Sequence, residues 1–77
     1  MNKEEREKVR QLAQIIKEKG VGFDRDALLI VGTFAFCEDA DKYGGTLHIL
    51  DEMIKILEEH PNVEEFMARV GRLVGLD

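Results

Sequence analysis

The stretch ALLIVGTFAFC, residues 27–37, decides the fold of this 77-residue chain. Every residue in it except Gly32 and Thr33 is apolar, and charged residues stand on both sides. β-Branched and aromatic residues are common in strands, so a central strand over residues 28–36 is one interpretation. A single strand among helices would leave its backbone N–H and C=O groups unpaired unless two chains paired across a dimer. We therefore predict a helix over residues 24–43.

Three further segments carry apolar residues at the i, i+3, i+4 and i+7 spacing of an amphipathic helix. They cover residues 3–19, residues 46–60 and residues 62–74. Together with helix 2, the helix over residues 24–43, they predict an all-α protein. The expected architecture is a compact four-helix bundle in a single domain spanning residues 1–77, with helix 2 largely buried.

Five residues mark the predicted helix ends. Asp24 and Thr46 are predicted to be the N-caps of their helices, and Asn62 the N-cap of the last one, because their side chains can accept hydrogen bonds from the first turn. Gly20 is predicted to cap the C-terminus of the first helix. Pro61 ends the third helix, since it cannot continue the hydrogen-bond ladder.

The apolar residues of helix 2 surround it. Phe34 and Phe36 are two residues apart, so they point about 200° apart on a helix. A helix in a four-helix bundle buries roughly three sevenths of its surface, so three neighbours cannot cover this one. A second copy of the chain is the simplest cover, and we predict a homodimer in which helix 2 packs against its counterpart. The predicted interface consists of Ile30, Thr33, Phe34, Phe36, Cys37, Glu38 and Asp41.

Charge is distributed unevenly along the chain. The net charge is −5, from 11 basic and 16 acidic residues. Six basic and four acidic residues fall in residues 1–19, which carry +2, so residues 20–77 carry −7. A mostly acidic surface repels phosphate, which argues against nucleic acid as a ligand. The alternative function is a small dimeric nucleic-acid-binding transcriptional regulator that uses the basic residues of the first helix, namely Lys3, Arg6, Lys8 and Arg10.

The reactive residues do not form a recognisable catalytic or metal-binding motif. Serine is absent, and the single cysteine, Cys37, stands beside acidic residues rather than beside a base that could activate it. The acidic stretch after it begins like a calcium-binding loop, but Leu50 stands where such a loop needs a glutamate. His48, Asp51 and Glu52 could bind a metal ion only weakly, because a structural zinc site needs four ligands. We expect no enzymatic activity, no cofactor and no metal site.

These features predict a small, acidic, non-enzymatic helical protein that acts by protein–protein interaction, of the regulator, adaptor or inhibitor type. Its expected partners are a second copy of itself and an unidentified protein. The longest apolar run is too short to span a membrane. The lone cysteine, and charged first residues with no apolar segment behind them, predict a cytoplasmic location.

Overall fold

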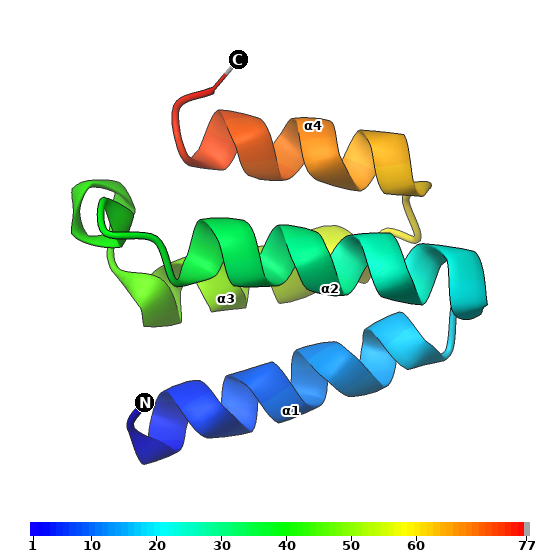
Figure 1. The fold of residues 1–77 in the computed structure, drawn as a ribbon, viewed down its shortest axis with the longest axis horizontal. Helices are drawn as coiled ribbons and strands as arrows, with labels where there is room; N and C mark the ends of the chain where they lie inside the picture. Colours follow the sequence, from blue (N-terminus) through cyan, green and yellow to red (C-terminus); the bar gives the residue numbers. More distant parts are fainter. Residues whose placement is uncertain (77) are drawn as a thin grey trace.

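The computed structural model describes residues 1–76 and contains four α-helices (Figure 1). None of residues 1–76 lies in a strand. The prediction of an all-α four-helix bundle is therefore confirmed, and the alternative, a strand over residues 28–36, is wrong. The elements in chain order are α1 (Lys3–Lys17), α2 (Val21–Ala35), the short 3-10 helix η1 (Ala40–Tyr43), α3 (Thr46–Leu57) and α4 (Val63–Leu73).

The helices form a flat slab with extents of 30 × 30 × 18 Å. α2 and α3 pack against each other in the middle, and each of them also packs against α1 and α4. Figure 1 looks onto one broad face, where α2 crosses in front of α3 while α1 and α4 lie at opposite edges. Each central helix therefore has one side that no other helix of the chain covers.

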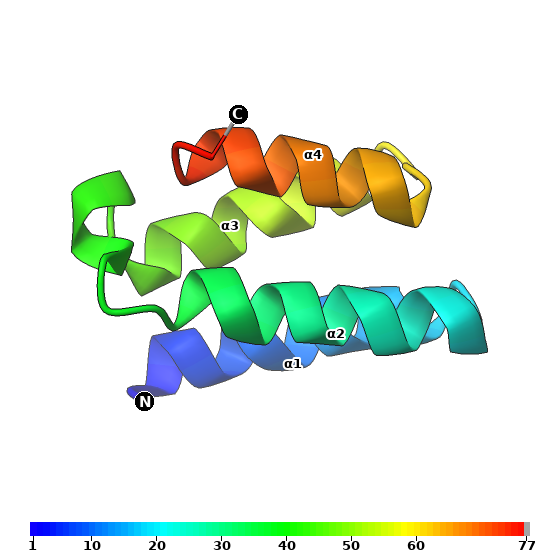
Figure 2. The ribbon, with the colours of Figure 1, turned by 45° about the horizontal axis from the view of Figure 1, so that its top comes forward.

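Consecutive helices run in opposite directions because short connections join them. α2 and α4 consequently run in the same direction, and α1 and α3 run in the other (Figure 2). The N-terminal ends of α2 and α4 thus lie at the same edge of the slab.

The core is built mainly on α3, in which six of twelve residues are buried. By contrast, only four of the fifteen residues of α2 are buried, and eight are exposed. The prediction that helix 2 is largely buried therefore holds for one side only, because residues 1–76 supply no fifth α-helix to cover the other side. The buried residues of α2 are Ala27, Ile30, Val31 and Ala35.

Two asparagines cap helices. Asn62 caps α4 as predicted, and its side-chain oxygen accepts a hydrogen bond from the backbone N–H of Glu65 at 2.8 Å. Asn2 caps α1 in the same way, accepting from the backbone N–H of Glu5 at 2.8 Å. The Glu5 side chain in turn accepts from the backbone N–H of Asn2, which completes a capping box.

The other predicted helix ends are wrong. α1 ends at Lys17 with Glu18, not Gly20, as its C-cap, and α3 ends at Leu57, four residues before Pro61.

Asp24 and Thr46 lie inside the first turns of α2 and α3, and the N-cap positions belong to Gly20 and Gly45. Gly20 has a φ of 105° and Gly45 a φ of 94°, values that other residues rarely adopt. These glycines let the chain reverse within few residues, so each helix begins earlier than a polar N-cap would have placed it.

α2 ends at Ala35, about two turns before its predicted end at Tyr43. Glu38 and Asp39 follow, and negative charges near a helix C-terminus oppose the helix dipole. The chain then turns so that Ala40 is buried and Tyr43 packs against the core from η1. Packing of this turn against the core therefore replaces the longer helix.

We expect Gly44→Ala to lower the free energy of unfolding by about 1–3 kcal/mol. Gly44 has a φ of +98°, and a Cβ atom there would lie 2.5 Å from Cδ2 of His48. Alanine would therefore be strained in its backbone and would also force the imidazole ring to move. Urea denaturation measures the change.

Gly22→Ala is the matched control for this prediction. No atom lies within 4 Å of a Cβ built at Gly22, so alanine should leave the stability equal or raise it. Equal losses in both variants would show that the backbone conformation of Gly44 is not the cause.

Candidate protein interface

The uncovered side of α2 is largely apolar. Leu29 is 70% exposed, Leu28 is 45% exposed and Phe36, the residue after the helix, is 43% exposed. Together with Arg25 and Gly32 they recur at spacings of three and four residues, so they lie along one side of the helix. We call Arg25, Leu28, Leu29, Gly32 and Phe36 the α2 stripe. α2 itself runs along the middle of one broad face of the slab (Figure 1).

The opposite broad face is charged. α3 runs along its middle, and the residues on the outer side of α3 are His48, Asp51, Glu52 and Lys55, of which His48 and Lys55 are exposed. Charged side chains lose nothing by staying in water, whereas apolar side chains gain free energy when they leave it. The two faces therefore differ in kind, and only the face with the α2 stripe gains from being covered.

Within residues 1–76, no neighbouring element packs against Gly32. It lies in a regular part of α2, and no atom is within 4 Å of a Cβ built on it. A glycine inside a helix costs about 0.5–1 kcal/mol relative to alanine. The packing within residues 1–76 does not need a glycine at this position. A second backbone that approached α2 closely at residue 32 would need one, because it would leave no room for a side chain.

Three of the predicted interface residues do not lie on the open side of α2. Ile30 is only 7% exposed and belongs to the core, and Phe34 packs against the core on the side that faces α4. Cys37 is half-buried, and its thiol donates a hydrogen bond to the carbonyl oxygen of Phe34 at 3.4 Å. The predicted interface residues that are exposed are Thr33, Phe36, Glu38 and Asp41.

Leu28 and Leu29 stand outside the predicted set, although they are among the exposed apolar residues of the chain. Their spacing carries a signal, because Leu29 precedes Gly32 by three residues and Phe36 by seven. That spacing places them on one side of a helix. The spacing does not determine which apolar side of α2 faces outward, because that depends on where the neighbouring helices pack.

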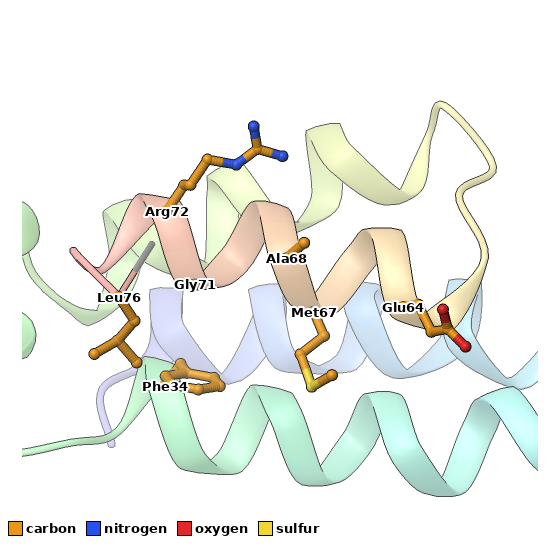
Figure 3. A pocket seen from close by; sticks show the side chains of 7 residues that line it. All are labelled: Phe34, Glu64, Met67, Ala68, Gly71, Arg72 and Leu76. Carbon is orange, nitrogen blue, oxygen red and sulfur yellow. The ribbon is translucent and has the colours of Figure 1, made fainter.

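A groove lies between α2 and α4, beside the α2 stripe. Figure 3 shows Phe34, Met67 and Leu76 converging on the space between the two helices, with Glu64 near one end. This part of the groove is a cleft of about 410 Å³. It is lined by Phe34, Glu64, Met67, Ala68, Gly71, Arg72 and Leu76.

Two ion pairs connect different elements of the slab. The Lys8 Nζ atom lies 2.9 Å from Oδ1 of Asp51 and links α1 to α3. Arg69 donates a hydrogen bond to Oε2 of Glu59 at 3.0 Å and links α4 to the loop before it. The hydrogen bond and the charge of Asp51 raise the pKa of Lys8 above its ordinary 10.5. Lys8 is thus engaged by Asp51, which weakens its predicted role in nucleic-acid binding.

We expect acid to destabilise the chain partly through Glu59. The hydrogen bond and the charge of Arg69 lower the pKa of Glu59 below its ordinary 4.5. Ionised Glu59 therefore stabilises the folded state above the unfolded-state pKa, and this contribution is lost as the pH falls through the lowered pKa. In Glu59→Gln the loss of stability between roughly pH 5 and pH 3 should be smaller than in the wild type, as thermal melts would show.

Glu58→Gln is the control for the acid prediction, because Glu58 forms no ion pair within residues 1–76. Its acid dependence should match that of the wild type. If both glutamine variants flatten the pH profile equally, the effect comes from net charge and not from the contact with Arg69.

Within residues 1–76, no three His, Cys, Asp or Glu side chains come close enough together to hold a metal ion. None of the helices in this part of the chain is both long enough and apolar enough to cross a membrane. In comparisons with known proteins, the chain matches no family model, no curated protein and no solved structure.

Proposed function

We propose that this chain is a small, acidic, non-enzymatic protein that acts through protein–protein interaction and forms a homodimer through the α2 stripe. The observation that carries the proposal is the stripe itself. Three exposed apolar side chains lie beside a glycine with open space around it, along the middle of one broad face. Soluble monomers scatter exposed apolar residues singly, whereas a contiguous strip is typical of an interaction site.

The broad face is large enough for a dimer. A stable interface buries about 800 Å² on each partner. The face measures 30 × 30 Å, so an interface of that size would extend from the α2 stripe over the flanking side of α1. The apolar stripe would then form the centre of the interface and the charged residues of its neighbours the rim, which is how protein interfaces are commonly arranged.

Charge favours antiparallel pairing of α2 with its counterpart. Arg25 lies seven residues before Gly32, and the acidic residues Glu38 and Asp39 lie six and seven residues after it. If two helices cross at Gly32 in opposite directions, each Arg25 faces the acidic turn of the partner. A parallel crossing would instead oppose like charges at both ends, which is unfavourable.

In light scattering we expect the wild type to have twice the mass of one chain and Gly32→Leu to have the mass of one. Two leucines that meet at the crossing point would force the helices apart, so the dimer should weaken at least about tenfold. The variant should keep its circular dichroism spectrum, because its own chain leaves open space at Gly32. Gln11→Leu, which adds the same side chain to an exposed position of α1, should remain dimeric.

Charge exchange tests the antiparallel direction in the same measurement. Arg25→Glu should weaken the homodimer, and so should the double change Glu38→Lys with Asp39→Lys. Mixing the two variants should restore a heterodimer, because opposite charges then face each other again. If the wild type stays monomeric throughout the micromolar range, the homodimer is wrong. If the two charge variants do not associate with each other, the antiparallel direction of α2 pairing is wrong.

The second candidate function is a dimeric nucleic-acid-binding regulator. It is supported by one arrangement in the structure: Lys3, Arg6, Arg10 and Lys17 are exposed and share one side of α1. The net charge of −5 opposes it. Retention on heparin at low salt that disappears with rising salt would favour this candidate, and absence of retention would favour protein–protein interaction alone.

A further inference from the structure

The groove between α2 and α4 follows α4 and the part of α2 that begins at Asp26. A cleft of about 360 Å³, lined in part by Leu29 and Ile30, shares Glu64 and Met67 with the central cleft. At the other end, a cleft of about 260 Å³ shares Phe34 and Leu76 with it. The three clefts therefore form one groove.

The length of this α2–α4 groove fits a short helix. On the α2 side it extends over the twelve residues from Asp26 to Cys37, and the eleven helical rises between them correspond to about 16 Å at 1.5 Å per residue. A helix of three turns covers the same distance. Leu29, Met67 and Leu76 are between 50% and 70% exposed along the groove, so an apolar helix face would bury them.

The groove carboxylates that form no ion pair within residues 1–76 are concentrated at one end. Asp26 and Glu64 both line the cleft at the N-terminal ends of α2 and α4. Both side chains are exposed, and neither forms an ion pair within residues 1–76. At the other end the lining carboxylate, Asp39, lies 3.6 Å from Nζ of Lys42 in an ion pair, and Arg72 borders the central cleft between the two ends. A ligand helix is therefore oriented by the two carboxylates.

We propose that the α2–α4 groove binds an amphipathic helix of another protein, three turns long, with lysine or arginine in its last turn beside Asp26 and Glu64. Basic residues in the last turn suit the helix's own dipole. The bound helix then runs antiparallel to α2 and α4, with its negative end near their positive N-terminal ends. The inference rests on the proposed function as an interaction protein, and it does not require the homodimer.

A designed peptide tests the proposal. The probe is a fluorescein-labelled 15-residue amphipathic helix with leucines on one side, glutamate in its first turn and two lysines in its last turn. The comparison peptide has glutamates in place of the lysines. We expect the lysine probe to bind at least tenfold more tightly in fluorescence anisotropy, and Asp26→Lys with Glu64→Lys to reverse the preference.

The control variant carries Glu18→Lys and Glu58→Lys, which change the net charge equally at two exposed sites outside the groove. It should keep the wild-type preference for the lysine probe. If it also reverses the preference, long-range charge explains the binding and the groove does not. If neither peptide binds the wild type at millimolar concentration, the proposal is wrong.

Filling the groove separates this inference from the homodimer. Ala68 is exposed and lines the central cleft, so Ala68→Phe should fold normally and weaken binding of the lysine probe at least tenfold. Its mass in light scattering should equal that of the wild type. If Ala68→Phe breaks the dimer, a second copy of the chain occupies the groove and the proposal is wrong. If the wild type is monomeric but binds the probe, the homodimer is wrong and the groove proposal stands.

Discussion

Phe34→Asp is expected to unfold the chain. The Phe34 ring is half-buried, packs against the core and forms part of the wall between α2 and α4. Aspartate there would lose the contacts of the ring with the core and part of the hydration of its own carboxylate, which together cost about 3 kcal/mol or more. A domain of this size has a free energy of unfolding of only about 5–15 kcal/mol, so circular dichroism should show a large loss of helix or a much lower urea midpoint.

Phe36→Asp is expected to leave the chain folded and to make it monomeric. Phe36 is 43% exposed and follows the last turn of α2, so aspartate there keeps its hydration. In the proposed dimer the Phe36 ring lies near the centre of the interface, where truncation or charge costs about 2 kcal/mol or more of binding energy. Light scattering should show one chain, and the helix content should equal that of the wild type.

The two phenylalanine variants test one statement, namely that Phe34 belongs to the fold and Phe36 to the surface that pairs. Gln11→Asp adds the same charge at an exposed position of α1 and should change neither mass nor stability. If both phenylalanine variants unfold, Phe36 is part of the core. If neither changes the mass, the interface does not include the end of α2.

Phe66→Ala should cause the second large effect, a loss of about 3–5 kcal/mol in the free energy of unfolding. Phe66 is fully buried, and its ring centroid lies 6.1 Å from that of Phe23 in a tilted arrangement. Alanine would leave a cavity where α4 packs against α2, and it would also remove the aromatic contact. Urea denaturation followed by circular dichroism measures the loss.

Phe23→Ala is the matched variant on the other side of this aromatic pair. Phe23 is only half-buried, so its removal should cost clearly less than removal of Phe66. Phe66→Leu, which keeps most of the buried volume, should also cost less than Phe66→Ala. Equal losses in the alanine variants of Phe23 and Phe66 would contradict the burial of Phe66 as the cause.

The sequence pattern predicts three of the helices because each carries its own period of apolar residues. The helix over residues 24–43 is predicted because a single strand there would leave its backbone N–H and C=O groups unpaired. Asn62 is predicted as an N-cap because a cap acts within three residues. The apolar surplus of α2 is also visible in the composition of residues 27–37. These features depend on neighbours along the chain.

The end of α2 and the direction of its open side depend on residues far away in the sequence. α2 ends at Ala35 because the following turn packs Ala40 and Tyr43 against the core. No periodic pattern of apolar residues predicts that packing. The open side is the side that α1, α3 and α4 leave uncovered in the slab. The groove joins Phe34 to Met67, which are 33 residues apart. Helices form from local interactions, but the surfaces between them exist only after the helices have packed.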